Sequence, residues 1–322
     1  MKRSIKSAYA ILCIIFLSIA ACAPEKSAVP DVDQTETMRP DIIATNAFYY
    51  YADVEVAWAF YRNTLGLETV ADYGFAKILR LADSSYLTLV QADSGMHSTA
   101  EPKTVTLNLV TDQLEAWYEH LQSSQVRMRV DYEKTDEQRS SSFVAVDPAG
   151  YFLKFVRHNP HPNHAAYVAA FSDATPVTAR IENLQTELSI RAVAFSAYFD
   201  KLDEVASFYE GLFDVSAIGQ LDGAPLYQMS GSGFLALVAG GDDLHQATKE
   251  NGVTLSFLTT DVDGWFDRAA NWTGFELRTP EILNESDLVR VFVGYDPSGI
   301  FLEWDTFLDL PGNEELVKYL DR

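Results

Sequence analysis

Apolar residues follow two periods along this chain, one typical of strands and one typical of helices. The aromatic-rich run from Asn46 to Tyr51 predicts a strand. From Asp53 to Leu65 apolar side chains recur at helical spacing, and Gly66 then fits a helix stop. Three further strand-like runs follow, at Glu68–Tyr73, Ala76–Leu81 and Tyr86–Val90. The pattern therefore predicts a βαβββ module.

The same order of one strand, one helix and three strands returns three more times. The second module is predicted from Thr104 to Val156, the third from Ile190 to Val238 and the fourth from Val253 to Trp304. A short helix is expected near the end, from Glu314 to Leu320. Four modules of one pattern predict an α+β protein built from repeated units.

Two short motifs indicate that the modules form pairs. Asp147-Pro148-Ala149-Gly150 returns 149 residues later as Asp296-Pro297-Ser298-Gly299, and both have the residues of a type I turn. Phe60-Tyr61 returns as Phe208-Tyr209 at an offset of 148 residues. Consecutive modules are therefore expected to form two tandem domains, at residues 42–160 and 189–308.

The segments outside these domains differ in composition. Residues 23–41 are polar and predict a flexible tether. Residues 161–188 are expected to form a connector with a short helix near Ala179–Thr186, and residues 309–322 form the tail that contains the terminal helix.

Residues 1–22 have the pattern of a bacterial lipoprotein signal peptide. Basic residues precede an apolar run, Ala8 to Leu17, that is short for a membrane span. Ile19-Ala20-Ala21-Cys22 resembles the lipobox, in which the cysteine is lipidated and becomes the first residue. By resemblance to sorted lipoproteins, Ala23 favours the periplasmic side of the outer membrane. An uncleaved anchor and an ordinary secretory signal are the alternatives.

Composition narrows the possible functions. The 322 residues carry a formal charge of −22, which argues against nucleic acid as a partner. Cys13 and Cys22 are the two cysteines of the chain, and both belong to the signal. The mature domains are therefore expected to have no disulfide, no thiolate metal site and no cysteine nucleophile.

Paired βαβββ modules resemble the vicinal oxygen chelate superfamily, which includes glyoxalase I, extradiol dioxygenases and bleomycin-resistance proteins. The resemblance rests on Asp53-Val54-Glu55, Ala59-Phe60-Tyr61-Arg62, Leu65-Gly66 and the two Asp-Pro-x-Gly turns. It implies that two modules close a curved mixed sheet into a cup. It also implies a divalent metal, which enzymes of the family hold with His, Gln or Glu on the first and last strands of each module.

The positions that the resemblance assigns to metal ligands hold few ligand residues here. They are Asn46, Thr88, Thr106 and Lys154 in the first domain and Ala194, Ala236, Thr254 and Glu303 in the second. They include no histidine, and Glu303 alone is of a recognised ligand type. A catalytic divalent ion needs about three protein ligands, so we expect no metal and no other cofactor.

His158, His161 and His164 form a separate histidine cluster. Three imidazoles can bind zinc. Pro160 and Pro162 interrupt this segment, so the three-residue spacing does not align the rings as a helix would. A solvated connector is the expected structure, and metal binding is the alternative.

Charged and aromatic side chains supply the remaining candidates. Lys154 and Glu303 each lie four residues after the glycine of a turn, and strand alternation places both on the cup face. Each charge either faces a ligand or has a structural explanation. The structural explanations are a solvated position at an open cup mouth and an internal salt bridge. The aromatic residues of the same parity, which either wall a ligand or fill the core, are Phe48, Tyr50, Phe152, Tyr198, Phe234 and Phe301.

These patterns favour a lipid-anchored protein that binds a small molecule in its cups without a metal. The candidate ligand-binding residues are Asn46, Phe48, Thr88, Thr106, Lys154, Tyr198, Thr254 and Glu303. The expected partners are a small-molecule ligand and the membrane, through a lipid on Cys22. The alternatives are a lyase, isomerase or dioxygenase with a site rearranged around Glu303, and a structural envelope lipoprotein with filled cups.

Overall fold

A computed structural model describes residues 39–133, 140–159, 161–162, 165–182, 184 and 186–321. The expected signal peptide with Cys22, most of the expected tether and His164 lie outside the described residues. None of the helices in the described part has the length and the apolar run needed to cross a membrane.

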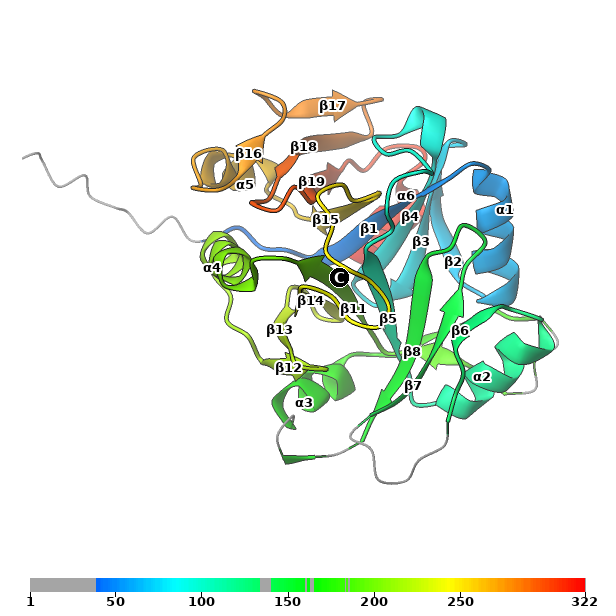
Figure 1. Ribbon diagram of the computed structural model, residues 1–322. Coiled ribbons are helices and arrows are strands. Elements are labelled where there is room, and N and C mark those ends of the chain that lie inside the picture. The colour runs from blue at the N-terminus through cyan, green and yellow to red at the C-terminus, as the bar shows by residue number, and fades with distance from the viewer. Residues whose placement is uncertain are drawn as a thin grey trace, which may run out of the picture. The chain divides into compact units, whose positions relative to one another are not determined.

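Four βαβββ modules follow one another along the chain (Figure 1). The first contains β1 (Ala44–Tyr51), α1 (Val54–Ala59), the π-helical turn η1 (Phe60–Thr64), β2 (Glu68–Asp72), β3 (Ala76–Ala82) and β4 (Ser85–Gln91). After the 3-10 turn η2 (Ala92–Ser94), the second contains β5 (Val105–Val110), α2 (Leu114–Ser123), β6 (Met128–Val130), β7 (Ser140–Val146) and β8 (Phe152–His158). The connector carries α3 (Ala165–Asp173), β9 (Val177–Thr178) and β10 (Ser189–Ile190).

The second half repeats this order, with one additional strand, β17, in the fourth module. The third module contains β11 (Ala192–Phe199), α4 (Leu202–Phe213), β12 (Gly219–Leu221), β13 (Ala224–Gln228) and β14 (Gly233–Ala239). The fourth contains β15 (Val253–Leu258), α5 (Val262–Ala269), β16 (Glu276–Leu277), β17 (Leu283–Glu285), β18 (Val289–Tyr295) and β19 (Phe301–Phe307), and α6 (Glu314–Leu320) follows.

Local chemistry explains where the first helix begins and ends. The carboxylate of Asp53 caps α1 by accepting hydrogen bonds from the amides of Glu55 (3.0 Å) and Val56 (3.3 Å). Gly66 ends the helical segment with a φ of +65°, and a Cβ there would lie 2.7 Å from the backbone nitrogen of Arg180. Both the left-handed conformation and the close approach therefore require glycine.

The modules pair in an order that differs from the one expected. β1 of module one runs antiparallel to β15 of module four, and β5 of module two runs antiparallel to β11 of module three. The strand orders are β16-β18-β19-β15-β1-β4-β3-β2, with β17 on β18, and β12-β13-β14-β11-β5-β8-β7-β6. We expected consecutive modules to share a cup, and that pairing is wrong. Every module offers the same first-strand edge, so the repeat alone does not determine which edges join.

Each of the two sheets forms one cup. The terminal cup is the concave face of the sheet from modules one and four, and the central cup is that of the sheet from modules two and three. The α+β class and the two curved mixed sheets are as expected. The boundaries 42–160 and 189–308 delimit the sequence repeats, whereas each sheet takes strands from both.

An ion pair demonstrates the curvature of the second sheet. Lys154 Nζ on β8 lies 2.5 Å from Asp222 Oδ2 in the turn between β12 and β13. Four strands separate β8 from β12, so a flat sheet would hold them about 24 Å apart. The sheet must curl for these side chains to meet.

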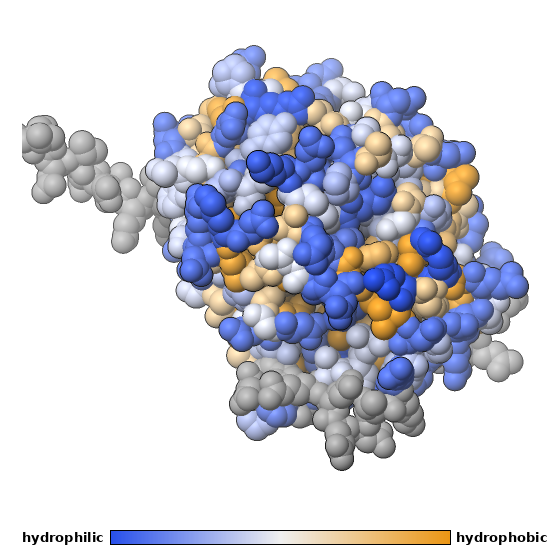
Figure 2. Space-filling model, in the orientation of Figure 1, coloured by the Kyte–Doolittle hydropathy of each residue, from blue (hydrophilic) through white to orange (hydrophobic). Residues whose placement is uncertain are grey.

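One continuous apolar core lies on the convex side of both sheets. Helices α1, α2, α4 and α5 contribute to it, with Trp117 and Trp265 among the fully buried side chains. On β1, Tyr49 and Tyr51 join this core, so the alternating neighbour Tyr50 points to the concave side. Hydrophilic residues cover most of the face in Figure 2, with apolar residues in smaller groups.

Helices α3 and α6 pack on the concave sides instead. Tyr167 of α3 shares a buried cluster with Ala194 and Ala236 of the central cup. Leu316 of α6, which lies 149 residues after Tyr167, shares one with Leu258 of the terminal cup. The expected connector and tail therefore fill one end of each cup.

The helix of the connector is not where we expected it. The described residues between 179 and 188 are irregular, and the helix is Ala165–Asp173. Tyr167 and Phe171 of this helix are four residues apart, so they lie on one face, and both are buried. Burial of this face against the cup selects the earlier segment.

The two motifs that revealed the repeat are in direct contact. The Oδ2 atom of Asp147 accepts hydrogen bonds from the hydroxyls of Tyr51 (2.7 Å) and Tyr61 (3.1 Å). In the second half, Tyr209 donates to Asp296 at 3.1 Å. Burial raises the pKa of Asp147 and that of Asp296, the latter to about 6. The motif thus fastens the helix of one module to the last hairpin of the next.

Candidate ligand-binding cups

The candidate residues divide between the cups by module and not by sequence half. Asn46, Phe48, Thr88, Thr254 and Glu303 belong to the terminal cup, whereas Thr106, Lys154 and Tyr198 belong to the central cup. Of the positions equivalent to metal ligands, Ala194 and Ala236 also fall in the central cup. Lys154 and Glu303 therefore face different cups.

The central cup contains a cavity of about 450 Å³. Thr106, Asn108 and Ser196 form its polar floor, and the ring of Tyr198 stands beside them. Lys154 and other charged groups lie around its mouth. This volume is in the range of small-molecule sites, which combine apolar walls with a few placed polar groups.

A chain of hydrogen bonds runs from the cavity floor to its mouth. The hydroxyls of Thr106 and Tyr198 are 3.0 Å apart, and Tyr198 donates to Asp242 Oδ2 at 3.0 Å. Burial raises the pKa of Tyr198, so the phenol stays protonated and can donate. Because it has a single proton, it must accept from Thr106.

The side-chain amide of Asn108 is oriented by three acceptors. Its Nδ2 atom donates to the carbonyl of Ala194 (2.8 Å), the hydroxyl of Ser196 (2.9 Å) and the carbonyl of Thr106 (3.3 Å). A carbonyl cannot donate, so the opposite amide orientation would lose these bonds. The Oδ1 atom of Asn108 therefore points away from these three acceptors.

Lys154 forms an internal salt bridge, which was one of the roles expected for it. Its partner Asp222 lies in the tip of the β12–β13 hairpin, where Asp222 and Gly223 have φ values of 51° and 90°. An Asp-Gly pair with two positive φ values is typical of a type I′ turn. The turn carries the carboxylate across the cup, where it balances the ammonium charge.

Residues 240–247 cross the mouth of the central cup, and we name this segment the central strap. The ring of His245 stacks on Phe152, with centroids 4.7 Å apart, and burial lowers its pKa to about 4. Arg129 donates to the carbonyl of Asp243 at 3.0 Å. The amide of Ala247 donates to the carbonyl of Gly240 at 2.8 Å and closes the segment on itself.

The terminal cup has a corresponding segment. His97 lies 148 residues before His245, and its ring meets Tyr50 edge-on with centroids 4.9 Å apart. The ring of Phe301 lies 5.8 Å from it, and Nδ1 is 2.6 Å from a carboxylate oxygen of Glu101. Both cups are thus crossed by a segment whose histidine packs on a tyrosine and a phenylalanine.

Polar side chains in the terminal cup bond mainly to each other. Asn46 donates to Thr88 at 2.9 Å, and the hydroxyls of Tyr50 and Thr254 are 2.8 Å apart. Asn46, Thr88 and Thr254 are nearly fully buried. Three of the candidate residues therefore have partners within the cup itself.

Glu303 lies beside a second carboxyl group, that of Asp305, on the same face of β19. Burial raises the pKa of Glu303, and the neighbouring charges of Asp305 and Glu285 raise it further. Burial also raises the pKa of Asp305, to about 7, although Ser256 donates to it at 2.6 Å. The two carboxyls are within hydrogen-bonding reach of each other, so their protonation is linked.

Neither cup fits the divalent metal that the resemblance implies. In the central cup the equivalent positions hold Thr106, Lys154 and two alanines that α3 covers. In the terminal cup the single carboxyl among them, Glu303, tends to keep its proton. Within the described ranges, no group of three or more His, Cys, Asp or Glu side chains is placed to hold an ion.

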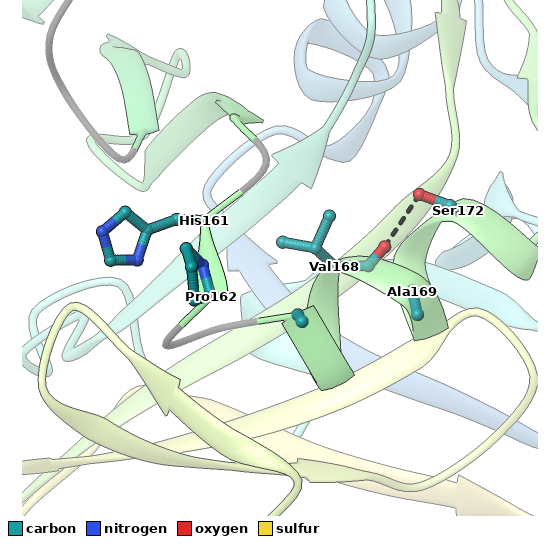
Figure 3. A pocket seen from close by; sticks show the side chains of 6 residues that line it. His161, Pro162, Val168, Ala169 and Ser172 are labelled. Atoms are coloured by element: carbon teal, nitrogen blue, oxygen red, sulfur yellow. Dashed lines mark hydrogen bonds between the residues drawn. The ribbon is translucent and has the colours of Figure 1, made fainter.

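His158, the last residue of β8, and His161 of the connector lie against different faces of α3. The ring of His158 packs against Tyr167 and Phe171 on the buried face, at centroid distances of 5.4 and 5.3 Å. Figure 3 shows His161 beside a second hollow, of about 460 Å³, with Val168 and Ser172 of α3 opposite. The Ser172 hydroxyl donates to the Val168 carbonyl at 2.8 Å, so few polar groups remain for a ligand there.

Sequence reasoning missed several polar residues of the cups. Asp305 shares the parity of Glu303, but the last strand was predicted to end at Trp304, and it runs to Phe307. Asp222-Gly223 has the sequence of a hairpin turn, but the sequence does not indicate that the Asp222 carboxylate reaches Lys154. Asn108 lies two residues after Thr106 on the same strand, and that spacing was the available signal.

Comparison with known proteins agrees with this architecture. Residues 43–155 match the Glyoxalase/Bleomycin resistance protein/Dioxygenase superfamily. No curated protein sequence gives a significant match.

Several solved structures cover most of the chain. A protein from Bacillus subtilis subsp. subtilis str. 168, assigned as a dioxygenase, aligns with a TM-score of 0.58 and 15% identity over 85% of this chain and 87% of its own. Glyoxalase I from Zea mays aligns with a TM-score of 0.56 and 11% identity over 85% of this chain and 94% of its own. At such identities the likeness establishes the fold alone. Residues 43–155 therefore match the Glyoxalase/Bleomycin resistance protein/Dioxygenase superfamily, and the chain shares the fold of these two structures across both halves.

Proposed function

We propose that this protein binds a small molecule in the central cup and needs no metal to do so. The observation that carries the proposal is the cavity of about 450 Å³, whose polar floor is ordered by hydrogen bonds before any ligand arrives. Preorganised polar groups lower the free-energy cost of binding. The ligand-equivalent residues of this cup, which are hydroxyl, ammonium and methyl side chains, support a role without a metal.

One pair of equivalent positions supports the choice of cup. Ser196 on β11 corresponds to Phe48 on β1, 148 residues earlier. Phe48 packs with the apolar residues of the terminal cup, whereas Ser196 lines the cavity of the central cup. A phenylalanine at position 196 would therefore fill the space that we assign to the ligand.

The test is a fragment screen by ligand-observed NMR on the purified mature chain. Fragments that bind the wild type are expected to lose binding to Ser196→Phe and to keep it with Phe48→Ser, the exchange made in the opposite direction. A circular dichroism melt shows that each variant is folded. If no fragment depends on Ser196, or if Phe48→Ser removes the same fragments, the proposal is wrong.

Elemental analysis tests the metal-independent part. We expect well below one Zn, Fe, Mn or Ni per chain after purification without chelators, because neither cup offers about three ligands. A stoichiometric ion that Glu303→Gln removes would contradict this expectation.

A second candidate is acid–base catalysis in the terminal cup, as in a lyase, isomerase or dioxygenase of rearranged site. The observation that favours it is the Glu303–Asp305 pair, whose raised pKa values suit proton transfer near neutral pH. Turnover in a panel of α-hydroxycarbonyl compounds that Glu303→Gln abolishes and Lys154→Met preserves would establish it. The remaining alternative, a structural lipoprotein, is favoured by α3 and α6, which fill one end of each cup.

We further propose that a lipid on Cys22 anchors the chain at the periplasmic side of the outer membrane. The support is the sequence pattern of residues 1–22. Cys22→Ser is expected to release the protein from membranes or to leave it unprocessed. Unchanged fractionation and unchanged electrophoretic migration of this variant would refute the anchor.

A further inference from the structure

We infer that the central cup selects ligands that bring hydrogen-bond donors, above all an apolar molecule with an ammonium group. This inference rests on the proposed function and adds the chemical class of the ligand. It follows from the direction of the hydrogen bonds in the cavity floor, from the charges at its mouth and from the apolar part of its wall.

The chain from Thr106 to Asp242 has one possible direction. The side chain of Asp242 accepts from the Tyr198 hydroxyl at 3.0 Å, so the Tyr198 proton points to it. Tyr198 must then accept the proton of Thr106. The proton of Thr106 is therefore engaged, and what its hydroxyl still offers the cavity is a lone pair.

Asn108 presents an acceptor for a similar reason. Its Nδ2 atom faces three acceptors, two of which are backbone carbonyls. No described residue donates to its Oδ1 atom, and the residue lines the cavity. Two adjacent floor residues thus offer acceptors and have their donors engaged.

The charges at the mouth reinforce this polarity. Asp222, Asp242 and Asp243 line the cavity with Lys154, which leaves an excess of two negative charges. The Lys154 ammonium already lies 2.5 Å from Asp222. An entering carboxylate would have to compete with that partner, whereas an entering ammonium meets carboxylates and neutral acceptors.

Apolar side chains form the remaining wall. Val130, Val144, Leu221, Val238 and Leu244 line the cavity beside the ring of Tyr198. They suit an apolar or aromatic body, whose head group would then lie at the polar floor.

Three probes share one aromatic body and differ in the head group: benzylamine, benzyl alcohol and benzoate.

The experiment titrates each probe into the mature chain at pH 7 and low salt, with calorimetry as the readout. Benzylamine, protonated at this pH, is expected to bind about tenfold or more tightly than benzoate, since charge-assisted hydrogen bonds are the strong ones. Benzyl alcohol, a neutral donor, is expected to fall between them. The preference for benzylamine should shrink in high salt because the carboxylates at the mouth are exposed.

Two neighbouring substitutions separate net charge from the direction of the chain. Asp242→Asn and Asp243→Asn each remove one negative charge from the central strap. Only the amide at position 242 can also donate to Tyr198, which would turn the Tyr198 proton to Thr106 and the Thr106 proton to the cavity. Asp242→Asn should therefore reduce the preference for benzylamine over benzoate about tenfold, and Asp243→Asn about two- to threefold. Asparagine can keep the Asp242 contacts to the amides of Leu244 and His245.

The outcomes distinguish the two proposals. Benzoate binding as tightly as benzylamine, or equal effects of the two variants, would overturn the inferred polarity and leave the cup as a binding site. A folded wild type that binds none of the three probes, together with a fragment screen that finds nothing dependent on Ser196, would overturn the proposed function itself.

Discussion

The terminal and central cups have the same frame. In each, a tyrosine on the first strand of one module bonds to a threonine on the first strand of its partner, Tyr50 to Thr254 and Tyr198 to Thr106. In each, a crossing segment places a histidine on that tyrosine. These contacts recur at offsets of 148 residues, so the repeat preserves the geometry of both mouths.

The floors of the two cups differ at positions that take no part in these shared contacts. Ser196 in the central cup replaces Phe48 of the terminal cup, and the cavity lies over this smaller side chain. Ala194, which replaces Asn46, is covered by α3. Lys154 on one last strand corresponds to Glu303 on the other. Hydrogen bonds between strands thus maintain the scaffold, and side chains that take no part in them determine what each cup can bind.

The largest expected effect concerns the buried aspartates that fasten the two modules within each half. The Asp147 carboxylate accepts bonds from two tyrosine hydroxyls and two amides, whereas that of Asp296 accepts from one hydroxyl and two amides. Asp147→Ala should lower the free energy of unfolding by about 3–5 kcal/mol, and Asp296→Ala by about 1 kcal/mol less, because buried polar groups are left unpaired. Urea unfolding measures both. Equal losses would mean that the second tyrosine bond adds nothing to the first half.

A smaller effect on the free energy of unfolding should depend on pH and should distinguish β19 of the terminal cup from β8 of the central cup. The folded-state pKa of Asp305, about 7, and that of Glu303 lie above their unfolded values, so the folded chain holds a proton that the unfolded chain has lost. This contribution to stability is complete below about pH 4 and is lost as the pH rises through 7. Glu303→Gln should therefore raise the free energy of unfolding by about 1–2 kcal/mol at pH 8 and change it little at pH 4.

The control for that experiment is the equivalent position of the central cup. For Lys154→Met, the difference from wild type should stay constant between pH 6 and 8. If Glu303→Gln is instead destabilising at pH 8, the carboxyl pair does not hold its proton in the folded state.

The smallest expected effect is that of Lys154→Met on stability at pH 7. The side chain of its partner Asp222 is 52% exposed and can return to water when the ammonium is removed. Exposed ion pairs contribute about 0–1 kcal/mol, so thermal and urea unfolding should show a loss below about 1 kcal/mol. A loss above about 2 kcal/mol would show that the pair closes the cup more tightly than its exposure indicates.

Local patterns in the sequence determined the units of this fold. Alternation placed Asn46, Lys154 and Glu303 on concave faces, Asp53 and Gly66 bounded the first helix, and the Asp-Pro-x-Gly turns preceded the last strand of each half. These features depend on neighbours within a few residues. Hydrogen bonding and side-chain periodicity of that range are readable from sequence.

The tertiary structure alone decided how the units combine. The first-strand edges of the four modules are alike and can pair in more than one way. Packing of the whole core selects the pairing of module one with module four. The same packing drew α3 and α6 into the cups and brought Asp222 to Lys154 across 68 residues. Contacts of this range depend on curvature and on which edges meet, and neither has a local signature in the chain.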